Sequence, residues 1–596
     1  MLEGPVDVCV DRPVLSLDRG FTYTLPAGSA AGVGSLVQVP FHGRRVRGWV
    51  LGPALEPPPR VLDVTAVVSP VRFFDPNGLR LFRWVADRYV APLAAVIGRA
   101  IPPRVVAEEE GFDAPAIDPP VRATSRDPRR TLATYRGGGT LAEALGDGSG
   151  AFRLRPAPED EVDLALEAVE RCLAGRRRAI VLVPEARPLP ATARAIAETF
   201  GERVGTLVGG DRRSRYRRWL EVLAGRYDVV VGTRPAVFAP LARVGLIYVG
   251  RESHPAHRED RAPYYHVRDV ARSRAELAGA VMVGAALCPS AELAAAPGVS
   301  AVAPAGRRWP PVEVVRPGPE GRAPRLVRAL RDARRAFVFS PVPGYGIAQV
   351  CRACGRPAAC AACGGALRVA SGAVTCVVCE SPGRCAHCGS ERFGIRRGGA
   401  ERVQEWAGAV ATVPVRRIEA PGRARLPRPG EILIGGADAV RDLGPGGLDL
   451  VAILDVDLSE RRAGLAARER SVAIAMEAIG WARPSGRAIV QSAHPAEPAV
   501  QALVRGNADR FLVDEASRRA AAGFPVGAPV FRVAGRPAVV RALEELLPTT
   551  LLVSSAGEQT VCLLALEPRR LPAFGATVRR LAARDIVSRV EAEPHL

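Results

Sequence analysis

The chain has 596 residues, 48% of them hydrophobic, and its 82 basic and 62 acidic residues give a net charge of +20. The length predicts several domains, because single cores rarely grow beyond about 250–300 residues. The start of the chain has neither a basic leader nor an apolar run, and no later stretch is apolar over about 18 residues. We therefore expect a cytoplasmic protein without a membrane partner.

Every basic residue is an arginine, and the chain contains no lysine. The excess of cations predicts a polyanionic partner, above all nucleic acid, because arginine binds phosphate as a bidentate fork. A solvated basic surface without a partner is the alternative. The absence of lysine also excludes a phosphate loop of the G-x-x-x-x-G-K-[ST] type.

The first part of the chain, residues 1–104, predicts a β-rich domain. Short apolar segments such as FTYTLP and GSLVQVPFHGRRVRGWVLG are broken by Gly and Pro, and a helix is expected near residues 78–89. Residues 105–150 are rich in Pro, Gly and charge. They predict a linker or a decayed winged-helix region.

Two α/β lobes are predicted next, because helical runs alternate with short apolar strands. RAIVLVPE, RYDVVVGTR, VGLIYVG and AVMVGAAL fall within residues 151–300, and RAFVFSP, EILIGG, LVAILDVD and GRAIVQSA fall within 301–349 and 389–515. This rhythm is typical of parallel sheets. Residues 516–596 predict a small α+β domain.

A cysteine module over residues 350–388 interrupts the second lobe. Four C-x-x-C pairs with spacers of five, twelve and five residues predict two closed Cys₄ zinc sites. The long spacer suits a hairpin that closes on the two inner pairs, so nested pairing is favoured over consecutive pairing. A disulfide framework is the alternative, but the chain lacks a secretory signal. The pairs are Cys351/Cys354, Cys360/Cys363, Cys376/Cys379 and Cys385/Cys388.

Several segments, in order along the chain, resemble the PriA family of replication-restart DNA helicases. They are IVLVPE, VVVGTRPAVFAP, YYHVRD, the cysteine array with the following RRGGAERVQE, and LDVD. The resemblance implies two RecA-like helicase lobes with a double Cys₄ zinc module inserted in the second lobe. It also implies that Cys351, Cys354, Cys385 and Cys388 hold one zinc ion, and that Cys360, Cys363, Cys376 and Cys379 hold the other.

The departures from the family pattern gather on its motor. The phosphate loop is replaced by FRLRPAPEDEVDLA, whose acidic residues 159–161 would repel a triphosphate. The D-E-E-H box reads Gly250, Arg251, Glu252 and Ser253, and Trp481 stands where the first arginine of the finger motif is expected. We expect that ATP and Mg²⁺ are not used and that the chain has no catalytic residues.

The resemblance extends to the N-terminal domain, which in the family recognises forks by binding the 3′ end of a nascent strand. Here it implies DNA contacts by Phe21 and Tyr23, which could equally be core, and by Arg44, Arg45 and Arg47. An aspartate that helps to hold the 3′ end in the family is replaced by Thr22.

The expected function is therefore recognition of stalled or abandoned forks and nucleation of primosome assembly without unwinding, in a protein associated with the nucleoid. Its expected partners are forked, branched or single-stranded DNA, the primosome and other replication proteins. The alternatives are an active ATP-dependent 3′ to 5′ DNA helicase of the same family, and a zinc-ribbon protein of RNA or translation.

Overall fold

The structure is a computed structural model, and it describes the chain in segments. These are residues 2–112, 119–122, 127–318, 321–341, 347–348, 350–354, 356, 358–362, 367–370, 373–376, 381–394, 400–418, 421–459, 464–557 and 559–594. Within these residues no helix is long and apolar enough to cross a membrane.

The N-terminal domain is a six-stranded sheet with the strand order β5-β2-β1-β4-β3-β6. Alternating apolar residues such as Val6, Val8 and Val37 form a core of their own inside it, as period-2 patterning requires. Two helices follow and pack against lobe 1. The elements are β1 (Gly4–Val10), β2 (Phe21–Leu25), β3 (Ser35–Phe41), β4 (Arg44–Pro53), β5 (Leu62–Asp63), β6 (Ala66–Arg72), α1 (Pro76–Arg88) and α2 (Leu93–Ala100).

Lobe 1 is an eight-stranded sheet with the order β10-β11-β9-β12-β13-β8-β14-β7, in which the short terminal strand β7 alone runs antiparallel to its neighbour. Its central strands are buried on both faces, which explains their continuous apolar sequences. The strands are β7 (Tyr135–Arg136), β8 (Gly150–Leu154), β9 (Arg178–Leu182), β10 (Val204–Leu207), β11 (Val229–Gly232), β12 (Val244–Gly250), β13 (Val281–Ala285) and β14 (Val299–Pro304). The helices are α3 (Gly138–Asp147), α4 (Glu161–Ala174), α5 (Ala191–Phe200), α6 (Arg212–Leu223), α7 (Val267–Ala278) and α8 (Ala291–Ala295).

Lobe 2 is a six-stranded sheet with the order β15-β25-β24-β16-β23-β22, and all of its pairings are parallel. The strands are β15 (Val312–Val315), β16 (Arg335–Phe339), β22 (Val415–Arg417), β23 (Glu431–Gly435), β24 (Leu448–Ile453) and β25 (Ala482–Gln491). The helices are α9 (Pro324–Asp332), α10 (Ala400–Val410), α11 (Val456–Ser459), α12 (Ala467–Ile479), α13 (Pro498–Arg505) and α14 (Asp509–Ala521). The fold class predicted from the sequence is confirmed by these two lobes.

The cysteine module leaves lobe 2 after β16, and the part of it that the structure describes contains short strands. They are β17 (Ile347–Ala348), β18 (Val350–Cys351), β19 (Leu367–Ala370), β20 (Ala373–Cys376) and β21 (Phe393–Gly394). The C-terminal domain is an antiparallel sheet with the order β27-β28-β26-β29. Its elements are β26 (Val530–Gly535), α15 (Val539–Glu544), β27 (Thr550–Ala556), β28 (Gln559–Ala565), α16 (Leu571–Ala582) and β29 (Val587–Ala592).

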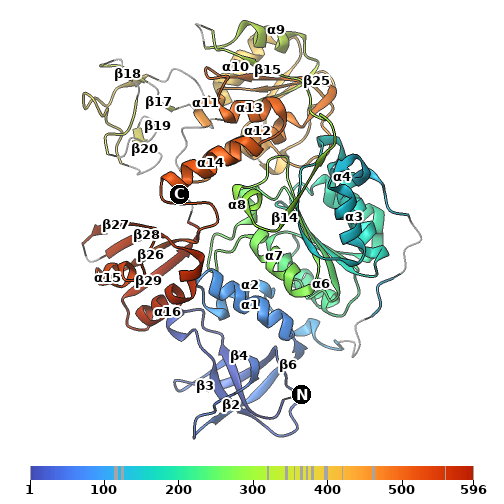
Figure 1. The fold of residues 1–596 in the computed structure, drawn as a ribbon, viewed down its shortest axis with the longest axis vertical. Coiled ribbons are helices and arrows are strands. Elements are labelled where there is room, and N and C mark those ends of the chain that lie inside the picture. The colour runs from blue at the N-terminus through green and yellow to red at the C-terminus, as the bar shows by residue number, and fades with distance from the viewer. Residues whose placement is uncertain are drawn as a thin grey trace.

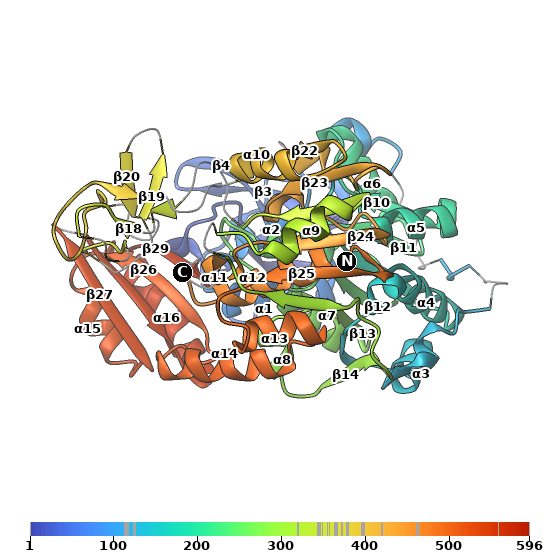
Figure 2. The same cartoon turned by 90° about the horizontal axis from the view of Figure 1, so that it is seen from above.

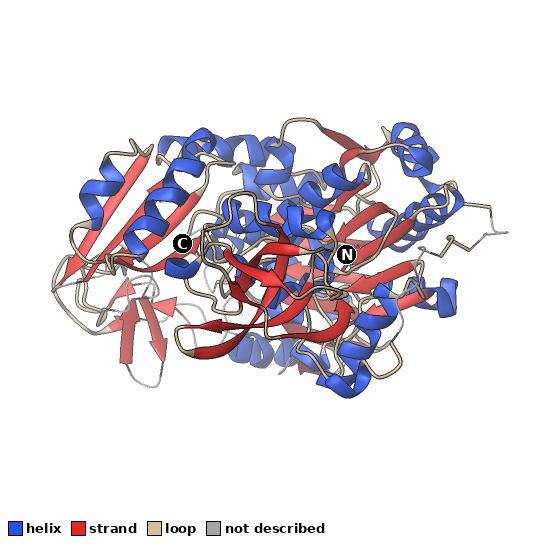
Figure 3. Ribbon diagram, turned by 90° about the horizontal axis from the view of Figure 1, so that it is seen from below, coloured by secondary structure: helices blue, strands red, loops and turns tan. Residues whose placement is uncertain are grey.

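The domains are arranged around lobe 1. Figure 1 shows the N-terminal sheet at one end of the long axis, lobe 2 at the other, and the C-terminal domain beside both lobes. The cysteine module stands off lobe 2 on the side of the C-terminal domain, and the view from above agrees (Figure 2). From below, the N-terminal domain is mostly strand, whereas the lobes combine strands with helices (Figure 3). One hydrophobic core runs from α1 and α2 through lobe 1 into the C-terminal domain.

Three predicted boundaries differ from the structure. The predicted linker over 105–150 contains α3, which packs on α4, and β7, which pairs with β14. The glycines that suggested a break start a helix instead, because Gly137 has a φ of 75° at the N-cap of α3. The boundary at 300 falls inside β14, and the boundary at 515 falls inside α14, whose Phe511 belongs to the core of lobe 2.

Candidate functional site

The loop that follows β8 lies at the cleft between the lobes, where the family resemblance predicts phosphate binding. It forms a short 3-10 turn, Pro158–Asp160, before α4. The Arg308 guanidinium donates to Glu159 (2.8 Å) and to Asp160 (2.9 Å), and the Tyr135 hydroxyl donates to Asp160 (2.8 Å). The acidic loop is therefore held by side chains of its own chain, in a geometry that presents carboxylates rather than a cradle of N–H groups.

Arg251 is the centre of an ion-pair network across the cleft. It follows β12, is 5% exposed, and pairs with Glu477 on α12 of lobe 2 and with Glu185 of lobe 1 (3.6 Å). Glu185 also pairs with Arg441 of lobe 2 and with His254 (3.1 Å). Arg251, in the segment where the resemblance places the metal box, thus joins the two lobes, as buried charges require partners.

Further contacts close the cleft on both sides of Arg251. The Thr192 hydroxyl at the start of α5 donates to Asp442 of lobe 2 (3.0 Å). Arg519 of α14 pairs with Glu292 of lobe 1 (2.9 Å). The lobes are joined by hydrogen bonds and ion pairs at several points rather than by one contact.

The cavity beside Arg251 is small. It measures about 30 Å³, with Glu161, Arg251 and Trp481 in its wall, whereas a pocket of about 380 Å³ lies between His254 of lobe 1 and the Arg441 and Glu477 side chains of lobe 2. Trp481 is buried and packs edge-on against Phe337, with ring centroids 5.0 Å apart. Burial and the nearby Asp442 carboxylate raise the pKa of Glu161 to about 8. A cavity of about 30 Å³ holds one or two water molecules.

Glu252 is the carboxylate that remains of the predicted metal box, and it is fully buried. It accepts hydrogen bonds from the Ser290 hydroxyl (2.6 Å) and the Ser290 backbone N–H (3.0 Å), and it pairs with Arg268 (3.4 Å). Burial raises its pKa, which Arg268 and Ser290 oppose. Its oxygens are therefore occupied by partners within lobe 1.

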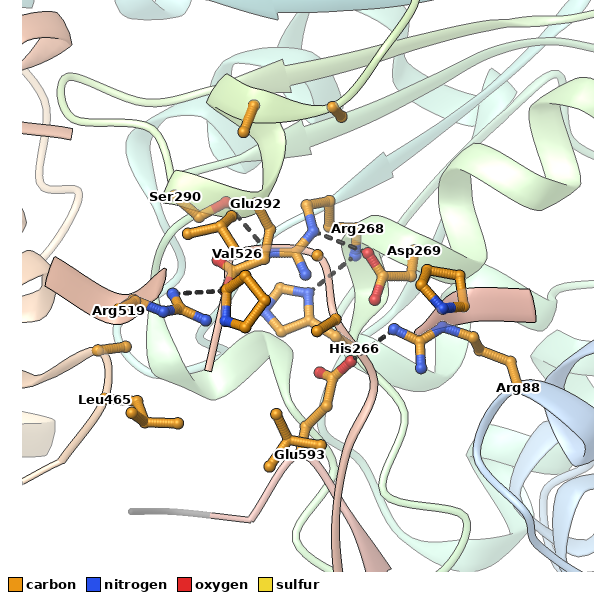
Figure 4. Close-up of a pocket in the computed structure, with 18 of the residues that line it drawn as sticks. Arg88, His266, Arg268, Asp269, Ser290, Glu292, Leu465, Arg519, Val526 and Glu593 are labelled. Carbon is orange, nitrogen blue, oxygen red and sulfur yellow. Dashed lines mark hydrogen bonds and ion pairs between the residues drawn. The ribbon is translucent and has the colours of Figure 1, made fainter. Parts of the chain in front are cut away.

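A larger pocket of about 780 Å³ lies where four domains meet (Figure 4). Its charged wall is paired: Arg268 binds Asp269 (2.8 Å), and Arg88 of α1 binds Glu593 near the C-terminus (3.0 Å). His266 caps α7 by accepting the Arg268 backbone N–H at Nδ1 (3.2 Å). These groups fasten the domains to one another.

Four cysteines of the module form a candidate metal centre. Their sulfurs lie within 4.8 Å of one another, with Cys351 Sγ 3.5 Å from Cys388 Sγ and Cys354 Sγ 3.7 Å from Cys385 Sγ. Backbone N–H groups of Cys354 and Ala353 help to lower the pKa of the Cys351 thiol to about 6, and thiolates are the form that binds metals. The structure thus brings together the two outer C-x-x-C pairs, as the nested pairing predicts.

The inner set is described in part. Cys360 and Cys376 are each 2% exposed. The structure describes neither Cys363 nor Cys379, and the predicted second site therefore lies partly outside the described residues.

Aromatic and cationic side chains gather at one end of the N-terminal sheet. Phe21 packs edge-on against Phe41 (centroids 5.0 Å apart), and the Arg19 guanidinium lies 4.9 Å from the centre of the Phe21 ring. Both phenylalanines are half-buried, so part of each ring remains open for stacking. Tyr23 is 5% exposed and donates its hydroxyl to the Pro40 carbonyl (2.9 Å). This corrects the prediction that Tyr23 contacts DNA.

The predicted arginines of this domain lie on the β3–β4 hairpin. Arg44, Arg45 and Arg47 are exposed. Arg45 and Arg47 point to the same face of β4, because the residues are two apart. They form a basic strip beside the aromatic end of the sheet.

Thr22 has a carboxylate beside it on the neighbouring strand. Its hydroxyl donates to Asp7 Oδ1 at 2.9 Å, and β1 and β2 place these two residues opposite each other. Asp7 thus places a carboxylate next to Thr22, the position at which the resemblance leads one to expect an aspartate. The sequence did not point to Asp7, because this proximity depends on strand register.

Comparisons with known proteins agree with this architecture. A family model for the 3′ DNA-binding domain of PriA matches residues 7–102. The probable replication restart protein PriA of Mycobacterium tuberculosis is 30% identical over 586 residues, with 89% of this chain and 86% of the relative covered. The chain belongs to the PriA family. The Mycobacterium leprae relative is 31% identical, with 91% and 88% covered, and the Treponema pallidum PriA is 28% identical, with 85% and 83% covered.

Solved structures resemble this PriA-family chain more distantly. One of Mss116p bound to ssRNA and AMP-PNP matches with a TM-score of 0.35 at 9% identity, covering 61% of this chain and 70% of that one. Likeness at this level supports no conclusion about function.

Proposed function

We propose that this PriA-family chain binds abandoned or stalled forks and nucleates primosome assembly without ATP-driven unwinding. The observation that carries this proposal is the ion pair between Arg251 and Glu477 across the cleft between the lobes. DNA binding is supported by the match of residues 7–102 to a 3′ DNA-binding domain and by the net charge of +20. Such a protein would associate with the nucleoid.

The small volume beside the acidic loop supports the absence of an ATPase. Ligand pockets for molecules of nucleotide size measure about 300–1,000 Å³, and about 30 Å³ remains beside Glu161 and Arg251. Opening the cleft to admit ATP would separate Arg251 from Glu477 and leave buried charges unpaired, which costs about 3–5 kcal/mol for a single pair.

The chemistry of the cleft argues in the same direction. A triphosphate with Mg²⁺ needs N–H donors, a lysine and carboxylates free to bind the metal. Here the acidic loop is paired with Arg308, and Glu252 is bound by Ser290 and Arg268. The described residues of this cleft do not fit a nucleotide with its metal.

The cysteine module is proposed to hold zinc. Four sulfurs from two C-x-x-C knuckles match the donor set of a closed structural site, and bound zinc would fold the module around them. We propose a second ion on the inner cysteines. Because such modules are rigid once loaded, this one would present a surface to primosome and other replication proteins.

The test of this function is a DNA-stimulated ATPase assay on the purified full chain, run beside a binding assay on a synthetic fork. We expect fork binding with no ATP turnover above background. The matched variant is Glu252→Gln, which removes the remaining metal-box carboxylate. Turnover that co-purifies with the chain and disappears in this variant would show an active motor and overturn the proposal.

A further inference from the structure

An exposed apolar strand forms one edge of the C-terminal sheet. β27 is the end strand of the order β27-β28-β26-β29, and among the described residues no strand pairs with its outer side. Figures 1 and 2 show it at the periphery of the molecule. Its sequence, TLLVSSA, contains neither a charge nor a proline, and its pairing with β28 continues through all seven residues without a bulge.

The other edge strands of the four domain sheets carry the features that keep an edge from pairing. These features are short length, charged residues and proline. β5 and β7 have two residues each, β10 has four, and β22 has three, of which two are arginines. β6 contains a proline and an arginine, and β15 and β29 contain glutamate. Among these described edges, β27 alone lacks all three kinds of protection.

Exposed apolar side chains gather on this edge. Of the ten large apolar residues that are exposed in the described part of the chain, three lie within residues 547–553. They are Leu547 (67% exposed), Leu552 (54%) and Val553 (46%). Leu552 and Val553 point to opposite faces of the sheet, because successive strand residues alternate. The edge is therefore apolar on both faces, and a group of exposed apolar side chains of this kind marks an interaction site.

The chemistry of β27 discriminates between possible partners. A polyanion or an acidic peptide would need cations on the strand, and a basic peptide would need carboxylates. Thr550–Ala556 has neither. The complement of an uncharged strand with apolar and hydroxyl side chains is another strand of the same kind. A second copy of this chain supplies one, and it brings no like charges opposite each other within the strands.

Two copies of β27 complement each other in one antiparallel register. This register places Leu552 opposite Leu552 of the other copy, and Leu551 then faces Val553. On either side, Thr550 faces Ser554. Apolar residues meet apolar residues and hydroxyls meet hydroxyls, which are pairs that stabilise antiparallel strands. A two-fold axis through Leu552 generates all of these pairs, and contacts of this isologous type are usual in homodimers.

The edge is large enough for a weak dimer. Its seven residues extend about 24 Å at about 3.4 Å per residue, and α15 lies beside β27 in both views (Figures 1 and 2). A sheet layer and a helix layer, each about 10 Å thick, give roughly 500 Å² per copy and about 1,000 Å² in total. Interfaces of this size lie at the low end of those that form in solution.

We propose that two copies of this chain associate through β27, which joins their C-terminal sheets of four strands each into one continuous sheet across a two-fold axis at Leu552. The pairing uses no residue of the N-terminal domain or of the cleft between the lobes. Each copy therefore keeps its own domain that matches the 3′ DNA-binding model. The association does not depend on whether the chain hydrolyses ATP.

The test is sedimentation velocity of the full chain without DNA, from about 1 to about 200 µM, the range in which weak interfaces associate. The average mass of the native chain should rise with concentration from 63.1 kDa toward twice that value. Leu552→Glu places two carboxylates opposite each other at the axis and should weaken the association at least about tenfold. Val513→Glu, at a side chain of α14 that is 68% exposed, is the matched control and should associate like the native chain.

A charge-swapped pair of variants separates loss of the contact from loss of the fold. Leu552→Arg alone should associate as weakly as Leu552→Glu. An equimolar mixture of the two should recover the association, because opposite charges then meet at the axis. Circular dichroism of both variants should match that of the native chain, since edge strands tolerate charge.

Three outcomes would overturn the proposal. A native chain that stays at 63.1 kDa over the whole range, as expected if the edge binds a different protein, is the first. A Leu552→Glu chain that associates as well as the native chain is the second. A mixture of the two charged variants that associates no better than either variant alone is the third.

Discussion

The cysteine module and the cleft between the lobes both gather groups that can bind metals or phosphates. They differ in whether these groups have ion-pair partners within the chain. In the module, four sulfurs converge within 4.8 Å. In the cleft, Glu185, Glu252 and Glu477 are each bound by an arginine of the chain. Ligating atoms without an internal counter-charge require an external one, whereas paired groups are already satisfied. This contrast is the basis for proposing a metal ion in the module and no nucleotide in the cleft.

The largest expected effect concerns the module. Cys354→Ser removes one of four outer sulfurs, and the zinc content should fall by one ion per chain, because structural sites contribute about 10–16 kcal/mol of apparent binding free energy. Metal analysis of the purified protein measures this. Cys562→Ala, at a buried cysteine of the C-terminal domain, is the control and should keep the metal content of the native chain. An unchanged zinc content in the Cys354→Ser variant would contradict a zinc ion on the outer cysteines.

In the cleft the opposite test applies. Arg251→Ala should lower the free energy of unfolding by about 3–5 kcal/mol, because Glu477 and Glu185 lose a buried counter-charge. Urea denaturation measures the change. The double variant Arg251→Met/Glu477→Gln should recover most of the loss, since Glu185 keeps Arg441 and His254. If Arg251→Ala costs less than 1 kcal/mol, the ion pair does not hold the lobes together.

A third variant tests whether the basic strip of the N-terminal domain binds the phosphates of DNA. Arg45→Ala/Arg47→Ala should lower the salt slope of duplex DNA binding by about 1.8, at about 0.9 per phosphate contact. Fluorescence anisotropy at four salt concentrations gives the slope. Arg541→Ala/Arg569→Ala, which removes two exposed arginines of the C-terminal domain, should leave it unchanged, and equal slopes in both variants would show that the strip does not touch the backbone.

Asp7 provides a finer test of the same surface. We expect the 3′ hydroxyl of the DNA to donate a hydrogen bond to the Asp7 carboxylate. Asp7→Asn should therefore weaken binding of DNA with a free 3′ hydroxyl about fivefold, because a hydrogen bond to a charged acceptor contributes roughly 1.5–3 kcal/mol and the amide oxygen keeps part of it. DNA ending in a 3′ phosphate should bind the variant better than the native chain. Equal losses for both DNA ends would mean that Asp7 acts only on the fold.

A separate expected effect is a pH dependence that originates at Glu161. Its pKa is raised to about 8 from an ordinary 4.5, so between these values the folded state binds a proton that the unfolded state releases. Stability from this group is therefore lost as the pH rises toward 8. Thermal unfolding at pH 6 and pH 8.5 should show a smaller decrease in Tm for Glu161→Gln than for the native chain. An equal decrease would place the titration elsewhere.

Sequence patterns predicted the features that depend on local spacing. The cysteine knuckles and the apolar strands of both lobes follow from residues close in sequence. The partners of Arg251 and of the acidic loop did not follow, because Arg251 meets Glu477 and Arg308 meets the acidic loop through the packing of distant segments. The error at Tyr23 has a related cause, since a strand residue faces the core or the solvent according to register.

The hydrophobic core shared by α1, α2, lobe 1 and the C-terminal domain has a mechanical consequence. Arg579 of α16 pairs with Asp18 of the N-terminal domain at 2.7 Å, so regions more than 500 residues apart are clamped side by side. A DNA strand end bound at Phe21 would then lie at a fixed distance and angle from a duplex arm bound to the other domains. The protein would therefore bind preferentially those branched DNAs whose arms match this distance and angle.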